Sequence, residues 1–117
     1  MIKILSVDTC SKACSVSVHY DDVLIGEIFL NTGLTHSQTL MPAVDSLLKF
    51  AGIKVKDIDL FGVTKGPGSF TGLRIGMASV KGMALPFNKP CAVISSLYAM
   101  AMNAVFLDGI VCCCMDA

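Results

Sequence analysis

The stretch from Lys65 to Gly76 reads KGPGSFTGLRIG, and it decides the fold because it joins a buried strand directly to a helix rich in small residues. Two glycines and a proline at 66–68 predict a tight turn with an unusual backbone path. Ser69 is placed to cap the helix that follows. Gly72 and Gly76 lie four residues apart and leave one helical face without side chains. Such a face accommodates either another segment of backbone or a ligand.

The glycines of this stretch do not have the spacing of a phosphate-binding loop. A P-loop requires Gly-x-x-x-x-Gly-Lys-Ser/Thr, whereas Thr71 and Leu73 stand five positions after Gly66 and Gly68. The dinucleotide-binding pattern Gly-x-Gly-x-x-Gly also fails at Thr71. An anion could still bind at the N-terminus of this helix, but the lines of small residues favour close approach of a neighbouring helix. We therefore predict that this helix contacts a partner through Gly72, Arg74, Gly76, Met77 and Ser79.

Hydrophobic periodicity divides the rest of the chain into strands and helices. Strands are predicted at 2–8, 14–20, 23–30, 58–64, 91–94 and 110–114. Helices are predicted at about 35–51, 69–85 and 95–106. In the first helix, Thr35 and Gln38 have the spacing of a capping box, and Pro42 is expected to kink the helix or delay its regular part. Leu40 and Val44 of the same helix are expected to lie alongside the glycine-rich helix at the partner surface.

The order of these elements predicts an α/β fold. Three antiparallel strands come first and form a meander, and helices then alternate with strands. This order is typical of a mixed five-stranded sheet with helices on both faces. The arrangement is ribonuclease H-like, and it is the building block of the actin-like ATPases.

Composition narrows the function classes. Hydrophobic residues make up 54% of the 117 residues, and nine basic residues balance nine acidic ones. A chain without a basic stripe is a poor nucleic-acid binder by itself, so any contact with RNA is expected to be indirect. We see no signal peptide and no uncharged apolar run long enough to span a membrane. We therefore expect a cytoplasmic protein with no membrane contact.

The residues that usually carry catalysis or bind metals are not arranged for either role. His19 and His36 are the only histidines and do not form His-x-x-x-His, and no Gly-x-Ser-x-Gly motif surrounds Ser69. The six cysteines include three in a row at 112–114 but no Cys-x-x-Cys pair. We predict buried, reduced thiols, no metal site, no cofactor and no catalytic residue.

Asp8, Thr9 and Lys12 follow the first strand and are candidates for phosphate binding. In actin-like ATPases an acid at this place helps to hold the metal–nucleotide phosphates. The loops of those enzymes are usually rich in glycine, whereas this one reads Cys10-Ser11-Lys12. The three residues therefore form a vestigial phosphate site, or else Asp8 caps the turn and Lys12 is solvated.

Several segments together resemble the TsaB (YeaZ) family, with the same order and spacing over the whole chain. The specific one is the glycine-rich stretch at 66–76, and the supporting ones are ILSVDT at 4–9, ACSV at 13–16, THSQ at 35–38 and LMP at 40–42. The resemblance implies the actin-like ATPase fold and a role in making threonylcarbamoyladenosine beside the anticodon of tRNA. It implies a non-catalytic dimerization or scaffold subunit and not an enzyme, although a glycoprotease-like or peptidase label is attached to the family.

The same resemblance implies partners. They are a catalytic TsaD-like subunit, which pairs with its relative through the first two helices, and a TsaE-like ATPase. A homodimer is expected when the partner is absent. An alternative function stays open, namely a nucleotide-binding transferase or a peptidase. Family members are roughly twice as long as this chain, so residues 1–117 are expected to be an N-terminal domain without the family's second domain.

Overall fold

A computed structural model describes residues 1–115 and contains one five-stranded sheet, three α-helices and two 3₁₀ turns. The strands are β1 (Lys3–Asp8), β2 (Cys14–Tyr20), β3 (Val23–Leu30), β4 (Leu60–Gly66) and β5 (Cys91–Ser95). The helices are α1 (His36–Ala51), α2 (Phe70–Ala84) and α3 (Ser96–Met102), with 3₁₀ turns η1 (Val55–Asp57) and η2 (Leu85–Phe87). The first five predicted strands and the first two helices are confirmed to within two residues at each end.

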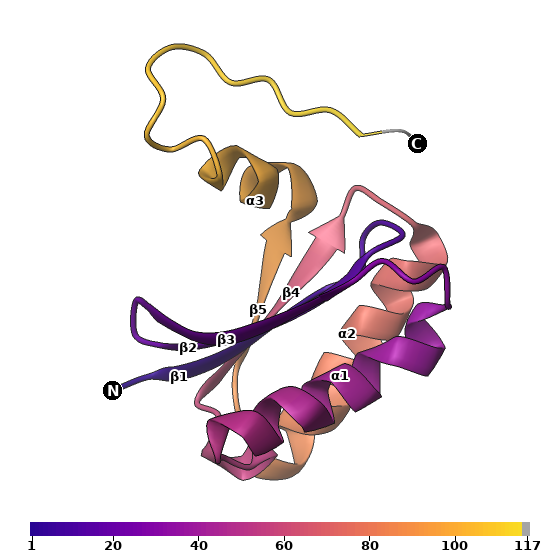
Figure 1. The fold of residues 1–117 in the computed structure, drawn as a ribbon, viewed down its shortest axis with the longest axis vertical. Helices are drawn as coiled ribbons and strands as arrows, with labels where there is room; N and C mark the ends of the chain where they lie inside the picture. The colour runs from indigo at the N-terminus through magenta and orange to yellow at the C-terminus, as the bar shows by residue number, and fades with distance from the viewer. Residues whose placement is uncertain (116–117) are drawn as a thin grey trace.

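The sheet is mixed, in the order β3-β2-β1-β4-β5. The first three strands form the predicted antiparallel meander, whereas β4 joins β1 and β5 joins β4 in parallel. α1 and α2 lie side by side on one face, and α3 stands on the other side, at the end of β5 (Figure 1). The predicted α/β fold, with helices on both faces, is therefore confirmed, although the two faces are covered very unequally.

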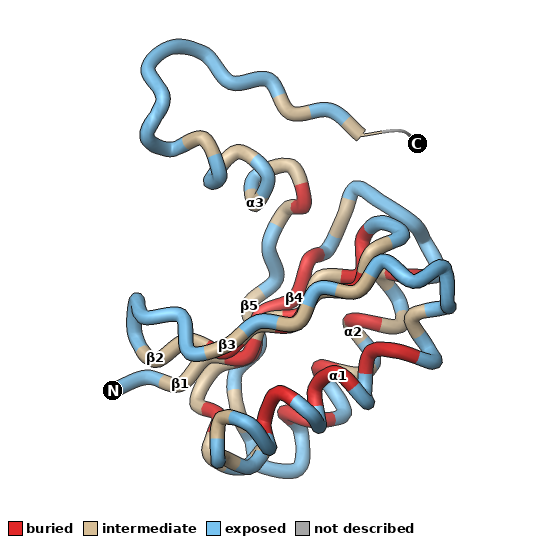
Figure 2. Tube along the Cα trace, viewed as in Figure 1, coloured by how far each residue is buried: buried red, intermediate tan, exposed pale blue. Residues whose placement is uncertain are grey.

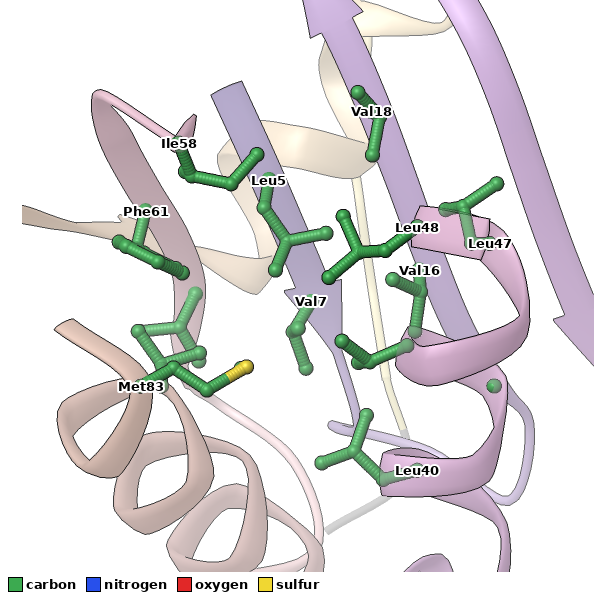
Figure 3. Close-up of a cluster of buried hydrophobic side chains, with 14 of the residues drawn as sticks. Leu5, Val7, Val16, Val18, Leu40, Leu47, Leu48, Ile58, Phe61 and Met83 are labelled. Atoms are coloured by element: carbon green, nitrogen blue, oxygen red, sulfur yellow. The ribbon is translucent and has the colours of Figure 1, made fainter. Parts of the chain in front are cut away.

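The core fills the space between the sheet and the α1–α2 layer. Alternate residues of each strand point into it because successive side chains leave opposite faces. Leu5, Val16 and Phe61 are completely buried there, and Figure 3 shows them opposite side chains from both helices. In Figure 2 the buried residues line the inner sides of both helices and the central strands, while α3 and the chain after it are mostly exposed.

Two predictions about elements are wrong. The third helix ends at Met102 instead of continuing to residue 106, and residues 110–114 form no strand. That strand was predicted from apolar residues that here remain on the surface, since Ile110 and Val111 are both exposed. Pro42 does not break α1, which runs from His36 to Ala51 and ends at Gly52 in the left-handed conformation.

Candidate functional site

The β4–α2 turn presses against the turn between β1 and β2. The Gly66–Pro67 peptide bond is cis, and Gly68 has a φ of 156°, which glycine adopts without strain. A Cβ on Gly68 would collide with the backbone of Cys10. The Ser69 amide donates a hydrogen bond of 2.8 Å to the Cys10 carbonyl. The two turns are therefore in direct backbone contact, and only glycine permits it at position 68.

The glycine face of α2 is occupied by the chain itself. The completely buried Thr9 donates a hydrogen bond of 2.6 Å from Oγ1 to the Gly72 carbonyl. A Cβ on Gly72 would overlap the Thr9 carbonyl, and one on Gly76 would overlap Thr9 Oγ1. The prediction that Gly72 and Gly76 leave room for a partner's helix is corrected: that room holds the β1–β2 turn of the same molecule.

Leu40 and Val44 also face inward. Each is only 1% exposed and belongs to the core beneath the sheet. The sequence predicts them at the partner surface, but they lie on the side of α1 that covers the sheet. The assignment of these two side chains to a surface contact is therefore wrong.

The remaining predicted interface residues lie on the outside or the flanks of α2. Arg74 is exposed, and its guanidinium lies 5.2 Å from the centre of the Phe70 ring, within cation–π distance. Met77 and Ser79 are half-buried on opposite flanks of the helix. We call the exposed side of α1 and α2 the outer helix face. Its exposed residues include Met41, Pro42 and Asp45 on α1, and Phe70, Arg74, Ala78 and Lys81 on α2.

Asp8 has a structural role. Its Oδ1 accepts hydrogen bonds of 3.0 Å from the Cys10 amide and from Thr64 Oγ1, so it closes the turn and ties β1 to β4. Lys12 is exposed and lines a neighbouring hollow instead, which neither Asp8 nor Thr9 reaches. The three candidate phosphate residues are thus not brought to one site, and the arrangement matches the alternative in which Asp8 caps the turn and Lys12 is solvated.

His36 makes a contact that no sequence pattern predicts. Its Nε2–H donates a hydrogen bond of 2.7 Å to the Ser11 carbonyl, and its ring lies against Gly72. The start of α1, the β1–β2 turn and the start of α2 therefore meet at one place. They surround a hollow of about 940 Å³, lined by Cys10, Lys12, Leu34, His36, Ser69 and Ile75 among others.

The residues at this junction mainly pack and hydrogen-bond with one another. Burial raises the pKa of the Cys10 thiol, and its hydrogen bond with Asp8 acts in the same direction, so the thiol is held protonated. Among residues 1–115, no group of three or more histidine, cysteine, aspartate or glutamate side chains is placed to hold a metal ion. Nor does any helix of that part of the chain have the length and apolarity needed to cross a membrane.

Comparison with known proteins gives consistent relatives. Residues 31–117 match the model of the family described as TsaD, tRNA N6-adenosine threonylcarbamoyltransferase. The chain is 35% identical, over 97% of its length, to the tRNA threonylcarbamoyladenosine biosynthesis protein TsaB of Bacillus subtilis, and 36% identical over 92% to that of Escherichia coli. A tRNA N6-adenosine threonylcarbamoyltransferase of Brucella ovis is 27% identical over 93% of this chain and is matched over 36% of its own length.

The solved structures agree with these relatives. YeaZ from Pseudomonas aeruginosa superposes with a TM-score of 0.82 at 33% identity, over 89% of this chain and 48% of that one. The chain spans about half the length of the TsaB relatives, 50% for Bacillus subtilis and 46% for Escherichia coli. The likeness therefore covers nearly all of this chain and about half of each relative.

Proposed function

Because this chain belongs to the TsaD-related family and, within it, to the TsaB (YeaZ) group, we propose that it serves the formation of threonylcarbamoyladenosine in tRNA. Its part is that of a non-catalytic scaffold subunit, acting in the cytoplasm and contacting tRNA only indirectly. The observation that carries this proposal is the match over nearly the whole chain to TsaB proteins, together with a junction built for packing and not for catalysis. We take the described residues, 1–115, as one actin-like domain, and the chain spans about half of the relatives' length.

The partner surface in this proposal is the outer helix face. Phe70 is 73% exposed and Met41 45% exposed, so two large apolar side chains lie on this side of the molecule. Arg74 is held over Phe70, and aromatic residues and arginine are the side chains that most often dominate binding energy. Met77 and Ser79 would contact a partner only at the flanks of α2. The partner is a TsaD-like subunit, a TsaE-like ATPase completes the complex, and a second copy takes the TsaD-like position when no partner is present.

Reconstitution tests the proposed function. The chain is mixed with TsaD-like and TsaE-like proteins, ATP, threonine, bicarbonate, a threonylcarbamoyl-AMP synthase and a substrate tRNA, and the modified base is measured by mass spectrometry. Omitting the chain is expected to abolish or strongly reduce modification. An unchanged yield without it would remove the proposed function.

Arg74→Glu tests the surface separately. Loss of a central arginine typically costs binding about 2 kcal/mol or more, so affinity for the TsaD-like subunit is expected to fall at least about tenfold, as measured by calorimetry. Lys56→Glu is the matched control because it makes the same charge change at an exposed residue of η1. Equal affinities of the two variants would contradict the assignment of the outer helix face.

The alternative is a nucleotide-binding transferase or a glycoprotease-like peptidase. Its support is the hollow beside Lys12, where the N-termini of α1 and α2 meet and could attract phosphate. Against it, Asp8 already accepts two hydrogen bonds and lies outside that hollow. Titration calorimetry of the isolated chain with ATP and Mg²⁺ distinguishes this alternative from the proposed scaffold function. Binding that disappears in Lys12→Ala would favour the alternative, and no measurable heat would remove its nucleotide-dependent form.

A further inference from the structure

The exposed side of α2 carries positive charge only. Phe70, Arg74, Ala78 and Lys81 are all exposed, and at about 100° per residue they lie within about 80° of one another around the helix. We call these four residues the α2 stripe. α2 contains no acidic residue, and it lies on the opposite side of the sheet from α3 (Figure 1). The α2 stripe therefore presents two cations to whatever covers it.

Neither cation of the α2 stripe is neutralised within the molecule. No carboxylate of residues 1–115 forms an ion pair with Arg74 or Lys81. On α1, by contrast, Asp45 and Lys49 pair with each other at 3.1 Å, so the charges of that helix cancel. A cation that is covered by a partner without an opposite charge loses its hydration and gains no compensating attraction. The partner that fits this surface is therefore one that supplies carboxylates.

A second copy is a poor complement to the α2 stripe. In a two-fold symmetric contact the same surface patch meets itself. Where two copies of α2 cross at the small Ala78, Arg74 lies about 6 Å along the helix to one side of the crossing and Lys81 about 4.5 Å to the other. In an antiparallel crossing Arg74 then faces Lys81 of the copy, and in a parallel crossing each cation faces its own counterpart. Like charges placed in this way oppose association.

We propose that Arg74 and Lys81 select a partner that presents an acidic helix to α2, and that they disfavour a second copy. Carboxylates on both sides of the crossing point pair with both cations, and the planar guanidinium suits a bidentate contact with a carboxylate. Phe70 and Ala78 supply the apolar part of the same contact. The inference rests on the proposed function for the place of the interface, and it adds the charge of the partner's surface.

A charge-reversed copy of the chain tests this selection. Arg74→Glu/Lys81→Glu keeps the same helix face but carries two carboxylates in place of the two cations. Sedimentation velocity, with one species labelled, measures the parent alone, the variant alone and their mixture at low ionic strength. We expect the mixed pair to be at least about tenfold tighter than either like pair. This preference is expected to shrink at about 0.5 M salt, where charges are screened beyond about 4 Å.

Lys56→Glu/Lys65→Glu is the matched control. It makes the same change in net charge at exposed residues of η1 and β4, outside both helices. Its mixture with the parent is expected to show no preference for the mixed pair, and circular dichroism checks that every variant is folded. Equal affinities of mixed and like pairs, or the same gain in the control mixture, would overturn the proposal.

The TsaD-like subunit provides a second test. Its affinity for the chain is expected to fall as salt is raised, and to fall at least about fivefold in Lys81→Glu, as measured by calorimetry. Unchanged affinity in Lys81→Glu would overturn the charge selection and leave the proposed function standing. A chain that is dispensable in reconstitution but still prefers its charge-reversed copy would remove the proposed function and support the charge selection.

Discussion

At the scale of single residues, Thr9 holds the N-terminal half of α2 against the β1–β2 turn. It is fully buried, and its hydroxyl donates a hydrogen bond to the Gly72 carbonyl. Its atoms occupy the space that a side chain at Gly72 or Gly76 would need. Well-packed interiors resist added volume. Thr9, which lies in a turn distant in sequence, therefore leaves room only for glycine at positions 72 and 76.

Gly76→Ala is therefore expected to destabilise the fold. The added methyl group would overlap Thr9 Oγ1, and overpacking of this kind costs about 1–3 kcal/mol. Gly82→Ala in the same helix is the matched control, since a Cβ there meets no atom within 4 Å, and alanine in an exposed helix should add about 0.5–1 kcal/mol of stability. Urea unfolding followed by circular dichroism measures both, and equal effects of the two changes would contradict the packing argument.

Cys10 and Cys14 make stability sensitive to alkaline pH. Burial raises the pKa of both thiols, while in the unfolded chain a thiol ionises near pH 8.5. The unfolded state therefore loses protons first, and the free energy of unfolding is expected to be unaffected by these thiols below about pH 8 and to fall as the pH rises through the folded pKa.

Unfolding in urea at about pH 8 and pH 10 checks this dependence. Cys14→Ala is expected to lose less stability between the two pH values than the parent chain does, because one buried thiol no longer titrates. Cys91→Ala, at an exposed thiol, is the control and should follow the parent. An identical loss in Cys14→Ala and the parent would show that the buried thiol has no part in the effect.

At the scale of elements, α2 depends on its N-cap residue, Ser69, as well as on its glycines. Ser69 Oγ accepts a hydrogen bond of 3.2 Å from the Gly72 amide, which is otherwise without an intrahelical partner. The first turn of α2 carries no acidic residue, so this cap is its main polar stabilisation.

Ser69→Ala is expected to lower stability by about 0.5–2 kcal/mol because the cap is lost. Ser69→Asp should retain most of the stability, since a carboxylate caps the amide and is favoured at a helix N-terminus. The control is Ser46→Ala on the exposed side of α1, which should change stability little. Thermal unfolding gives the ranking, and an Ala variant as stable as the parent would contradict the capping role.

The elements were largely predictable from the sequence, and the contacts between them were not. Alternating strands and the Thr35 and Gly52 helix boundaries are local signals, so the meander and α1 could be placed within two residues. The partner of the glycine face lies 63 residues away in sequence at Thr9, and no periodicity reports such a contact. Helical spacing also cannot say which of two faces is inside, and for that reason Leu40 and Val44 were assigned to the surface although they form the core.

At the scale of the whole molecule, the two faces of the sheet differ in how much they are covered. α1 and α2 cover one face along its length, whereas α3 stands only at the end of β5 on the other (Figure 1). Large apolar side chains consequently remain exposed on β5 and beyond, among them Val93, Ile94 and Tyr98. Exposed apolar surface of this kind favours association.

Lysine at this surface tests that expectation. Val93→Lys places a charge on the edge strand, and charged edge residues oppose pairing with other chains. We expect the variant to stay soluble at higher concentration than the parent with its affinity for a TsaD-like subunit unchanged, as measured by light scattering and calorimetry. Ser46→Lys is the control because it adds the same charge at an exposed residue of α1, away from β5. Equal solubility of the two variants would argue against β5 as the association surface.

The central place of β1 has a consequence for synthesis on the ribosome. β1 emerges first, β2 can then pair with it, and β3 can pair with β2, both as local hairpins. Its other edge is covered only by β4, so that edge waits until residues 60–66 have left the exit tunnel. Nascent chains stalled before β4 are therefore expected to be digested by protease and held by chaperones, and chains stalled well beyond α2 to resist digestion, because only then is the middle of the sheet closed.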